Sequence, residues 1–259
     1  MRLLFILVLL ILPHSIYSQS FNSPISLSDT VSIKSISPKT PLSNAFRSQW
    51  IKGAILPAGL IFAGAITLMP DSHTLLSKYT IHEKVKTLFP DFHSSLDNYM
   101  QYAPLAAVFA LKAAGVKSRS DFINQAVITA KAELLMTVIV QGMKRTISSE
   151  RPSGSGMNSM PSGHTAQAFV SATILDMEYR DTSPWISVGG YAVATTTAIY
   201  RMANNQHWIS DVLIGAGIGI FSTKIVYYTH RYRWGGKKNM IILPTIYKNG
   251  GGVSFAMML

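Results

Sequence analysis

Apolar residues form six long runs along the chain, separated by shorter polar stretches. The runs cover roughly residues 51–69, 101–115, 122–143, 164–177, 184–200 and 208–228. They lack the strict alternation of apolar and polar positions that marks a half-buried strand, and each is long enough for a helix. We therefore expect an all-α fold, a bundle of about six apolar helices within residues 51–235.

Several of these runs are only marginally long for a membrane span, which needs roughly 20 residues when it runs perpendicular to the bilayer. Charged residues also interrupt them, namely Lys112, Lys131, Glu133, Asp176 and Lys224. The pattern therefore favours a membrane-associated or integral bundle that crosses incompletely, or is tilted and shelters these charges, over six spans facing lipid.

The two ends of the chain differ from the bundle. Residues 1–20 have one arginine, an apolar core and then small polar residues, the pattern of a secretory signal peptide, with a retained short anchor as the alternative. Residues 21–50 are rich in serine and proline and predict an irregular leader. In residues 236–259, β-branched and aromatic residues flank Asn249 to Gly252, which predicts a short β-hairpin; a mobile tail is the alternative.

Composition narrows the classes of partner. Of 259 residues, 48% are hydrophobic and only 14% are charged, and the net charge is +11. Such basic chains bind nucleic acid, anionic lipid or phosphorylated substrates, but here the positive charges lie between apolar runs and in Arg231–Lys238, as at a membrane boundary. The absence of cysteine excludes disulfides, thiolate zinc sites and cysteine nucleophiles. We expect a membrane and a lipid phosphate as partners, no nucleic acid, and leave the oligomeric state open.

Three polar clusters lie beside the ends of apolar runs. In the first, KRTISSERP, Lys144 and Arg151 flank a polar turn; the second is PSGH, residues 161–164; in the third, YRMANNQHWISD, Arg201 precedes His207. Lysine and arginine supply cations for phosphate oxygens, and guanidinium groups bind them in a bidentate manner. The alternatives are interfacial basic side chains for the first cluster and a helix-terminal charge for Arg201.

His207 and Asp211 are spaced as i and i+4, which predicts that they share one face of a helix. The carboxylate can then accept the proton of one ring nitrogen and leave the other nitrogen as a nucleophile. An ordinary surface helix pair is the alternative. In the second cluster, Ser162 and Gly163 precede a helix whose first amides can hold an anion, and His164 can give a proton to a leaving oxygen; an ordinary N-cap is the alternative.

In this order, K-x6-R-P, P-S-G-H and R-x5-H-x3-D resemble the three-part signature of the type 2 phosphatidic acid phosphatase superfamily. That superfamily includes lipid phosphatases, bacterial class A acid phosphatases and vanadium haloperoxidases. The resemblance spans about residues 100 to 228, with Pro152 and Pro161 in their signature positions. Tyr200 precedes Arg201, where the family often has serine; we expect catalysis to persist and Tyr200 to reshape one pocket wall.

The resemblance implies a helical bundle and metal-independent hydrolysis, with no cofactor. It assigns His207 as the nucleophile, His164 as acid and base, and Asp211 as the residue that orients His207. The phosphate holders that it implies are Lys144, Arg151, Ser162, Gly163 and Arg201. No dense carboxylate cluster accompanies these histidines, and His73, His82 and His93 are too irregularly spaced to predict a metal site.

The leading hypothesis is an exported, membrane-associated phosphatase that forms a phosphohistidine and acts on lipid A, an isoprenoid pyrophosphate or a phosphatidyl phosphate. The alternatives are a soluble periplasmic acid phosphatase, a vanadate haloperoxidase, which the chain length disfavours, and a non-catalytic protein that binds anionic lipid. The last needs only cations, not two histidines and Asp211. We expect a location in the bacterial envelope with the site facing the periplasm; incomplete spanning reconciles a cleaved signal peptide with the positive-inside rule.

Overall fold

The computed structural model describes residues 41–68, 77–232, 240–247 and 250–257, with side chains for 51–68 and 77–232. The predicted signal peptide and residues 21–40 of the leader lie outside the described residues. All the elements below lie within one unit, Pro41–Leu259.

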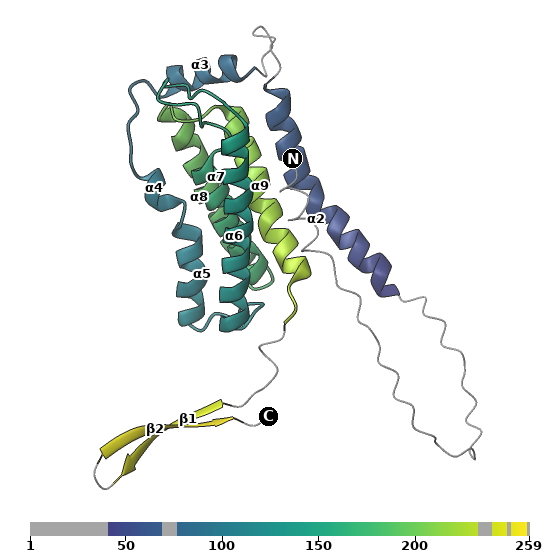
Figure 1. Cartoon of the computed structure of the whole chain (residues 1–259), viewed down its shortest axis with the longest axis vertical. Helices are drawn as coiled ribbons and strands as arrows, with labels where there is room; N and C mark the ends of the chain where they lie inside the picture. Colours follow the sequence, from purple (N-terminus) through teal and green to yellow (C-terminus); the bar gives the residue numbers. More distant parts are fainter. Residues whose placement is uncertain (1–40, 69–76, 233–239, 248–249, 258–259) are drawn as a thin grey trace, which may run out of the picture. The chain divides into compact units, whose positions relative to one another are not determined.

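The described residues form eight helices and two strands, shown in Figure 1. The six predicted runs correspond to the long helices, which confirms the helical bundle. The elements are α2 (Pro41–Ile66), α3 (Lys78–Leu88), α4 (Asp97–Met100), α5 (Ala103–Ala113), α6 (Phe122–Thr146), α7 (Gly163–Tyr179), α8 (Pro184–Ala203), α9 (Ile209–Thr229), β1 (Met240–Tyr247) and β2 (Gly250–Met257).

Two parts of the secondary structure differ from the sequence prediction. Helix α2 begins at Pro41, so residues 41–50 are helical rather than part of an irregular leader. Proline is well placed at a helix start because its fixed φ suits the first turn and its missing N–H is not needed there. The connection before the second run also contains α3 and α4; Ser77 caps α3 by accepting a hydrogen bond from the amide of Tyr79.

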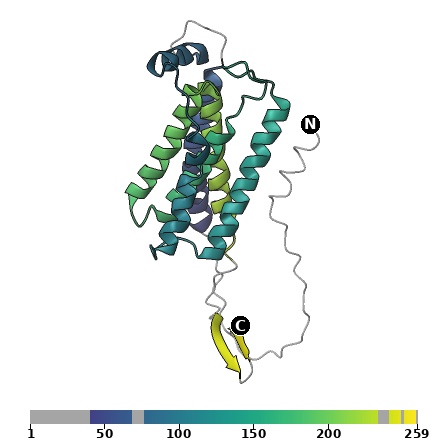
Figure 2. The ribbon, with the colours of Figure 1, turned by 90° about the vertical axis from the view of Figure 1, so that its left-hand side faces the viewer.

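Helix α7 is the centre of the bundle. All but a few of its residues are buried, and it contacts α5, α6, α8 and α9 along its length. Figures 1 and 2 show these helices running side by side, with α3 across one end. The apolar core includes Ile128 and Val140 from α6, Ile174 from α7 and Ile218 from α9. Burial of these side chains fixes the helix ends relative to one another.

Two glycines of α9 allow it to approach α7 closely. A side chain at Gly215 would collide with the backbone oxygen of Ser162, and one at Gly219 with that of Ala166. Without Cβ atoms at these positions the two backbones come into direct contact. The start of α9 is thereby held against the start of α7.

The predicted hairpin is present at the C-terminal end of the described residues. Strands β1 and β2 pair antiparallel, with Met240 opposite Met257 and Tyr247 opposite Gly250. This pairing confirms the prediction for the tail.

Among the described residues, two helices, α6 and α9, are long and apolar enough to cross a membrane by length and composition. Most of α9 is buried inside the bundle, as in the core of a soluble protein, whereas most of α6 is not. Large apolar side chains are exposed on several helices, including Ile55 and Phe62 on α2, Leu134 on α6, and Trp185 and Val188 on α8. Length and composition alone give weak support for spanning, but the exposed apolar faces match a bundle in contact with lipid.

Candidate active site

The three polar clusters meet at one end of the bundle, where α6 and α8 end and α7 and α9 begin. The amide of Ser162 donates to the carbonyl of Asp211 at 3.0 Å, which joins the second cluster to the third. The indole Nε1 of Trp208 donates to the carbonyl of Glu150 at 2.7 Å, which joins the third to the first. Residues that are far apart in the sequence are therefore held in one small region.

His207 and Asp211 form a buried pair, with Nδ1 of the ring 3.5 Å from Oδ2 of the carboxylate. The predicted contact is present, but the predicted reason for it is wrong. His207 lies in the loop before α9, which begins at Ile209, so the two residues do not share a helix face. The carboxylate of Asp211 turns back over the first turn of α9 and also accepts the amide of Trp208 at 3.0 Å. It thereby fixes the loop that holds the imidazole, and Nε2 remains as the second ring nitrogen.

Ser159 completes this arrangement, and the sequence analysis assigned it no role. Its hydroxyl donates to Oδ2 of Asp211 at 2.5 Å and lies 3.4 Å from Nδ1 of His207. The side chain is fully buried. Because the hydroxyl and the imidazole approach the same carboxylate oxygen, Ser159 limits where the carboxylate can turn.

Electrostatics keep the buried His207 neutral at pH 7. Burial is the main cause that lowers the pKa of His207 to about 4; the charges of Arg201 and Arg151 act in the same direction, and Asp211 acts against them. A neutral imidazole has a free lone pair, which a nucleophile requires. The site therefore favours the reactive form of the ring.

Lys144 and Arg151 are linked through Asn158. The ammonium group donates to the carbonyl of Asn158 at 2.5 Å, and Nε of Arg151 approaches its side-chain oxygen at 3.3 Å. Arg151 also donates to the side chain of Gln206 at 2.7 Å. Burial and the nearby Arg201 lower the pKa of Arg151, which shows that these cations repel one another. An anion placed among them would relieve that repulsion.

Arg201 is buried at the end of α8 and is held by a partner that the sequence analysis did not identify. Its NH1 donates to Oδ2 of Asp97 at 2.8 Å, and the Asp97 side chain is 1% exposed. The Nε atom of Arg201 is buried without a hydrogen-bond partner among the described residues. Asp97 therefore fixes the guanidinium while leaving part of its donor capacity unused.

The PSGH segment starts α7 as predicted, but its donors are arranged differently from the expectation. Ser162 is the N-cap, and its hydroxyl oxygen accepts from Thr165. Its amide already donates to Asp211, so it is not free for an anion. The open first-turn amides are those of Gly163 and His164. A Cβ atom at Gly163 would meet only Val140 within 4 Å, at 3.9 Å, so the surroundings of this position are not crowded.

His164 lies at the same helix start and is oriented by Asn98, which the sequence analysis also missed. Its Nε2 is 2.8 Å from the side-chain oxygen of Asn98. Because an amide oxygen only accepts, Nε2 holds the hydrogen of this bond, and Nδ1 is left to exchange protons. Burial, followed by the charge of Arg201, lowers the pKa of His164 to about 4.

The histidines outside the clusters form no metal site in the described residues. No group of three or more His, Asp or Glu side chains there could hold an ion. The His82 ring packs edge-on against Trp208, and the His93 ring bonds to the carbonyl of Asp91. His73 lies outside the described residues.

The missed site residues had weak signals in the sequence. Asp97 and Asn98 stand together in a polar connection just before an apolar run, and Ser159 stands two residues before the PSGH segment. A single Asp, Asn or Ser in such a place is common. Only the packing of α4 against α7 and α8 brings Asp97 to Arg201 and Asn98 to His164.

Three comparisons bear on this site. Residues 125–235 match the family model of the PAP2 superfamily. The lipid A 1-phosphatase of Porphyromonas gingivalis is 42% identical over 132 residues, which are 51% of this chain and 30% of that protein. A crystal structure of LpxE from Aquifex aeolicus has 24% identity and a TM-score of 0.42, covering 56% of this chain and 93% of that one. That TM-score is too low to support an argument.

The chain thus spans less than a third of the P. gingivalis relative. The family match, in contrast, contains every residue of the three-part signature, from Lys144 to Asp211. The PAP2 superfamily model therefore matches the part of this chain that carries the whole three-part signature.

Proposed function

We propose that the chain is a metal-independent phosphatase that hydrolyses the phosphate ester of a lipid through a phosphohistidine at His207. The observation that supports this most directly is the buried His207–Asp211 pair, 3.5 Å apart, which interacts electrostatically with Arg151, Arg201 and Lys144. A non-catalytic anion site needs the cations alone and gains nothing from an oriented, neutral imidazole.

In the first step, Nε2 of His207 attacks phosphorus and the bond from phosphorus to the lipid oxygen breaks. Lys144, Arg151, Arg201 and the open amides at the start of α7 stabilise the charge on the equatorial oxygens. The imidazolium of His164 gives its proton to the leaving oxygen. Binding of the phosphate dianion raises the pKa of His164, because its charge opposes that of the neighbouring arginines.

In the second step, water attacks the phosphohistidine. His164, now neutral, takes a proton from this water as its oxygen bonds to phosphorus and the P–N bond breaks. Inorganic phosphate leaves, and His207 returns to its starting form with Nδ1 still held by Asp211. Asn98 and Asp97 keep the acid-base residue and one cation in place throughout.

The bundle surface supports a lipid rather than a small soluble ester as substrate. Phe62 on α2, Leu134 on α6 and Val188 on α8 are each more than half exposed. Such faces are stable against acyl chains, and a site at one end of the bundle then lies at the depth of the headgroups. The curated relative named above is a lipid A 1-phosphatase, so lipid A is the first substrate to test. We also propose export to the bacterial envelope with the site facing the periplasm.

The proposal is tested by assaying the purified full chain for phosphate release from lipid A, phosphatidic acid and a soluble sugar phosphate in the same detergent micelles. We expect lipid substrates to be preferred and vanadate to inhibit by occupying the transition-state site. His207→Ala should abolish phosphate release and leave the helical circular dichroism signal unchanged. Normal turnover in that variant would falsify the mechanism, and equal kcat/KM on all three substrates would contradict the lipid assignment.

A further inference from the structure

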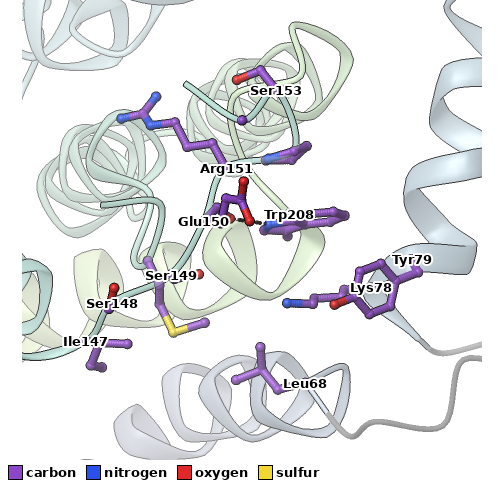
Figure 3. Close-up of a pocket in the computed structure, with 13 residues that line it drawn as sticks. Leu68, Lys78, Tyr79, Ile147, Ser148, Ser149, Glu150, Arg151, Ser153 and Trp208 are labelled. Carbon is purple, nitrogen blue, oxygen red and sulfur yellow. Dashed lines mark hydrogen bonds between the residues drawn. The ribbon is translucent and has the colours of Figure 1, made fainter. Parts of the chain in front are cut away.

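A cavity of about 720 Å³ lies beside Arg151, one of the proposed phosphate holders, and the proposed reaction does not use most of this cavity. Figure 3 shows the ring of Trp208 between Glu150 on one side and Lys78 with Tyr79 on the other, and Leu68 across the gap. We call this space the α3 cavity, because Lys78 and Tyr79 begin helix α3. It is large enough for a ring-sized headgroup and much larger than one phosphate.

The α3 cavity borders the proposed phosphate-binding residues at Arg151, which is one of its lining residues. Trp208 directly follows His207, and Met160, another lining residue, directly precedes the PSGH segment. A substrate whose phosphate binds Arg151 can therefore place the group next to its phosphate in this cavity.

The wall of the α3 cavity is rigid and aromatic. Tyr79 and Trp208 pack edge to face with ring centroids 5.3 Å apart, and Nζ of Lys78 is 5.0 Å from each centroid. The indole is fixed by its hydrogen bond to the carbonyl of Glu150. Lys78 makes no ion pair within the part of the chain that has described side chains. Its donors are therefore available to a ligand.

These features match the chemistry of a sugar ring. A pyranose has a flat face of C–H groups, which packs on an aromatic wall, and a rim of hydroxyl groups that both donate and accept hydrogen bonds. Lys78 and the carboxylate of Glu150 offer a donor and an acceptor at opposite sides of that wall. A glycerol or isoprenoid headgroup has no ring to place there.

We propose that the α3 cavity is a second subsite, which binds the sugar ring next to the scissile phosphate of a glycolipid substrate. This proposal rests on the proposed phosphatase function and adds a specificity to it. Lys78, Tyr79 and Trp208 select the headgroup and take no part in the chemical steps.

The test compares two substrates with the same acyl chains in the same micelles, an acylated glucosamine 1-phosphate and phosphatidic acid. Lys78→Gln and Tyr79→Leu should each lower kcat/KM on the sugar substrate about tenfold, the effect of losing one charged hydrogen bond or one stacked ring, and change it less than about twofold on phosphatidic acid. Lys84→Gln, an exposed lysine on the same helix, is the matched control and should behave as the unaltered chain.

Equal losses on both substrates, or no loss on the sugar substrate, overturn the subsite while leaving the phosphatase standing. Loss in Lys78→Gln with none in Tyr79→Leu identifies a site for the phosphate charge alone and also overturns the subsite. Failure of the unaltered chain to hydrolyse either substrate contradicts the proposed function instead. The subsite is then tested by calorimetric titration of glucosamine 1-phosphate into His207→Ala, with and without the additional Lys78→Gln substitution. Binding that becomes about tenfold weaker with Lys78→Gln supports the subsite, and absence of binding rejects it.

Discussion

Two buried carboxylates at opposite ends of α7 have different kinds of partner. Glu178, at the end of the helix, accepts from the amide and hydroxyl of Ser120 at 2.8 and 2.7 Å and from the hydroxyl of Tyr227 at 2.6 Å. Asp211, packed against its start, accepts from Ser159 and the amide of Trp208 and pairs with His207. Both groups are buried and hydrogen-bonded, yet we assign catalysis to only one of them.

The difference lies in what the partners can still do. Ser120 and Tyr227 use their donors on Glu178, so their hydrogen bonds hold α7, α9 and the loop before α6 together. His207 uses one ring nitrogen on Asp211 and keeps another for a substrate, and cations gather around it. A buried carboxylate thus has a structural role when its partners only donate hydrogen bonds to it, and a functional role when one partner can also react with a substrate.

The largest expected effect separates the two carboxylates directly. Asp211→Asn should lower kcat about 10³- to 10⁴-fold with little loss of stability, because the amide stabilises the wrong imidazole tautomer. Glu178→Gln should leave kcat within about twofold but lower the free energy of unfolding by about 1–3 kcal/mol, since one buried donor loses its acceptor. Steady-state kinetics and urea unfolding in one detergent measure both. The comparison fails if Glu178→Gln loses as much kcat as Asp211→Asn.

Ser159→Ala sharpens the comparison within the site. The carboxylate of Asp211 keeps the amide of Trp208 but loses one of its donors, so we expect kcat to fall about tenfold. Ser162→Ala serves as a neighbouring control that removes a helix cap instead, and its effect should appear mainly in thermal stability. An unchanged kcat in Ser159→Ala would remove this serine from the orienting group.

Acid should destabilise the fold through the buried His207. The folded pKa of His207 is about 4, below the value near 6.5 of an unfolded chain, so its contribution to stability is present above pH 6.5 and is lost as the pH falls through about 4. His207→Ala should reduce the difference between urea-unfolding free energies at pH 7 and pH 4.5. A difference equal to that of the unaltered chain would contradict the assignment.

Asn98→Asp tests how His164 is oriented. A carboxylate at the position of the amide oxygen, 2.8 Å from Nε2, should raise the pKa of His164 and move the basic limb of the kcat–pH profile to higher pH. Asn98→Ala should lower kcat with no such shift. Identical pH profiles in all three proteins would show that Asn98 does not position the histidine.

The smallest expected effect is that of a chelator. Because three cations and the first-turn amides supply the positive charge, activity should persist in excess EDTA. Loss of activity that magnesium or zinc restores would contradict this account.

The sequence by itself determined the helical class, the six long helices and the hairpin, because apolar periodicity and turn residues act locally. It also determined the ten signature residues and their order, since residue type and spacing alone define that pattern. It misplaced the start of α2, where no apolar period marks the boundary, and it overlooked α3, whose few apolar positions give a weak helical signal.

Only the tertiary structure decided the partners of those residues. Asp97, Asn98 and Ser159 reach Arg201, His164 and Asp211 across large sequence separations, through packing that no local pattern specifies. It also decided that His207 and Asp211 meet across a loop rather than on a helix face, although the spacing fits both geometries. The spacing of two residues in the sequence limits the contacts that they can make with each other. The tertiary structure selects one of these contacts, because the packed core fixes the helix ends that hold the two side chains.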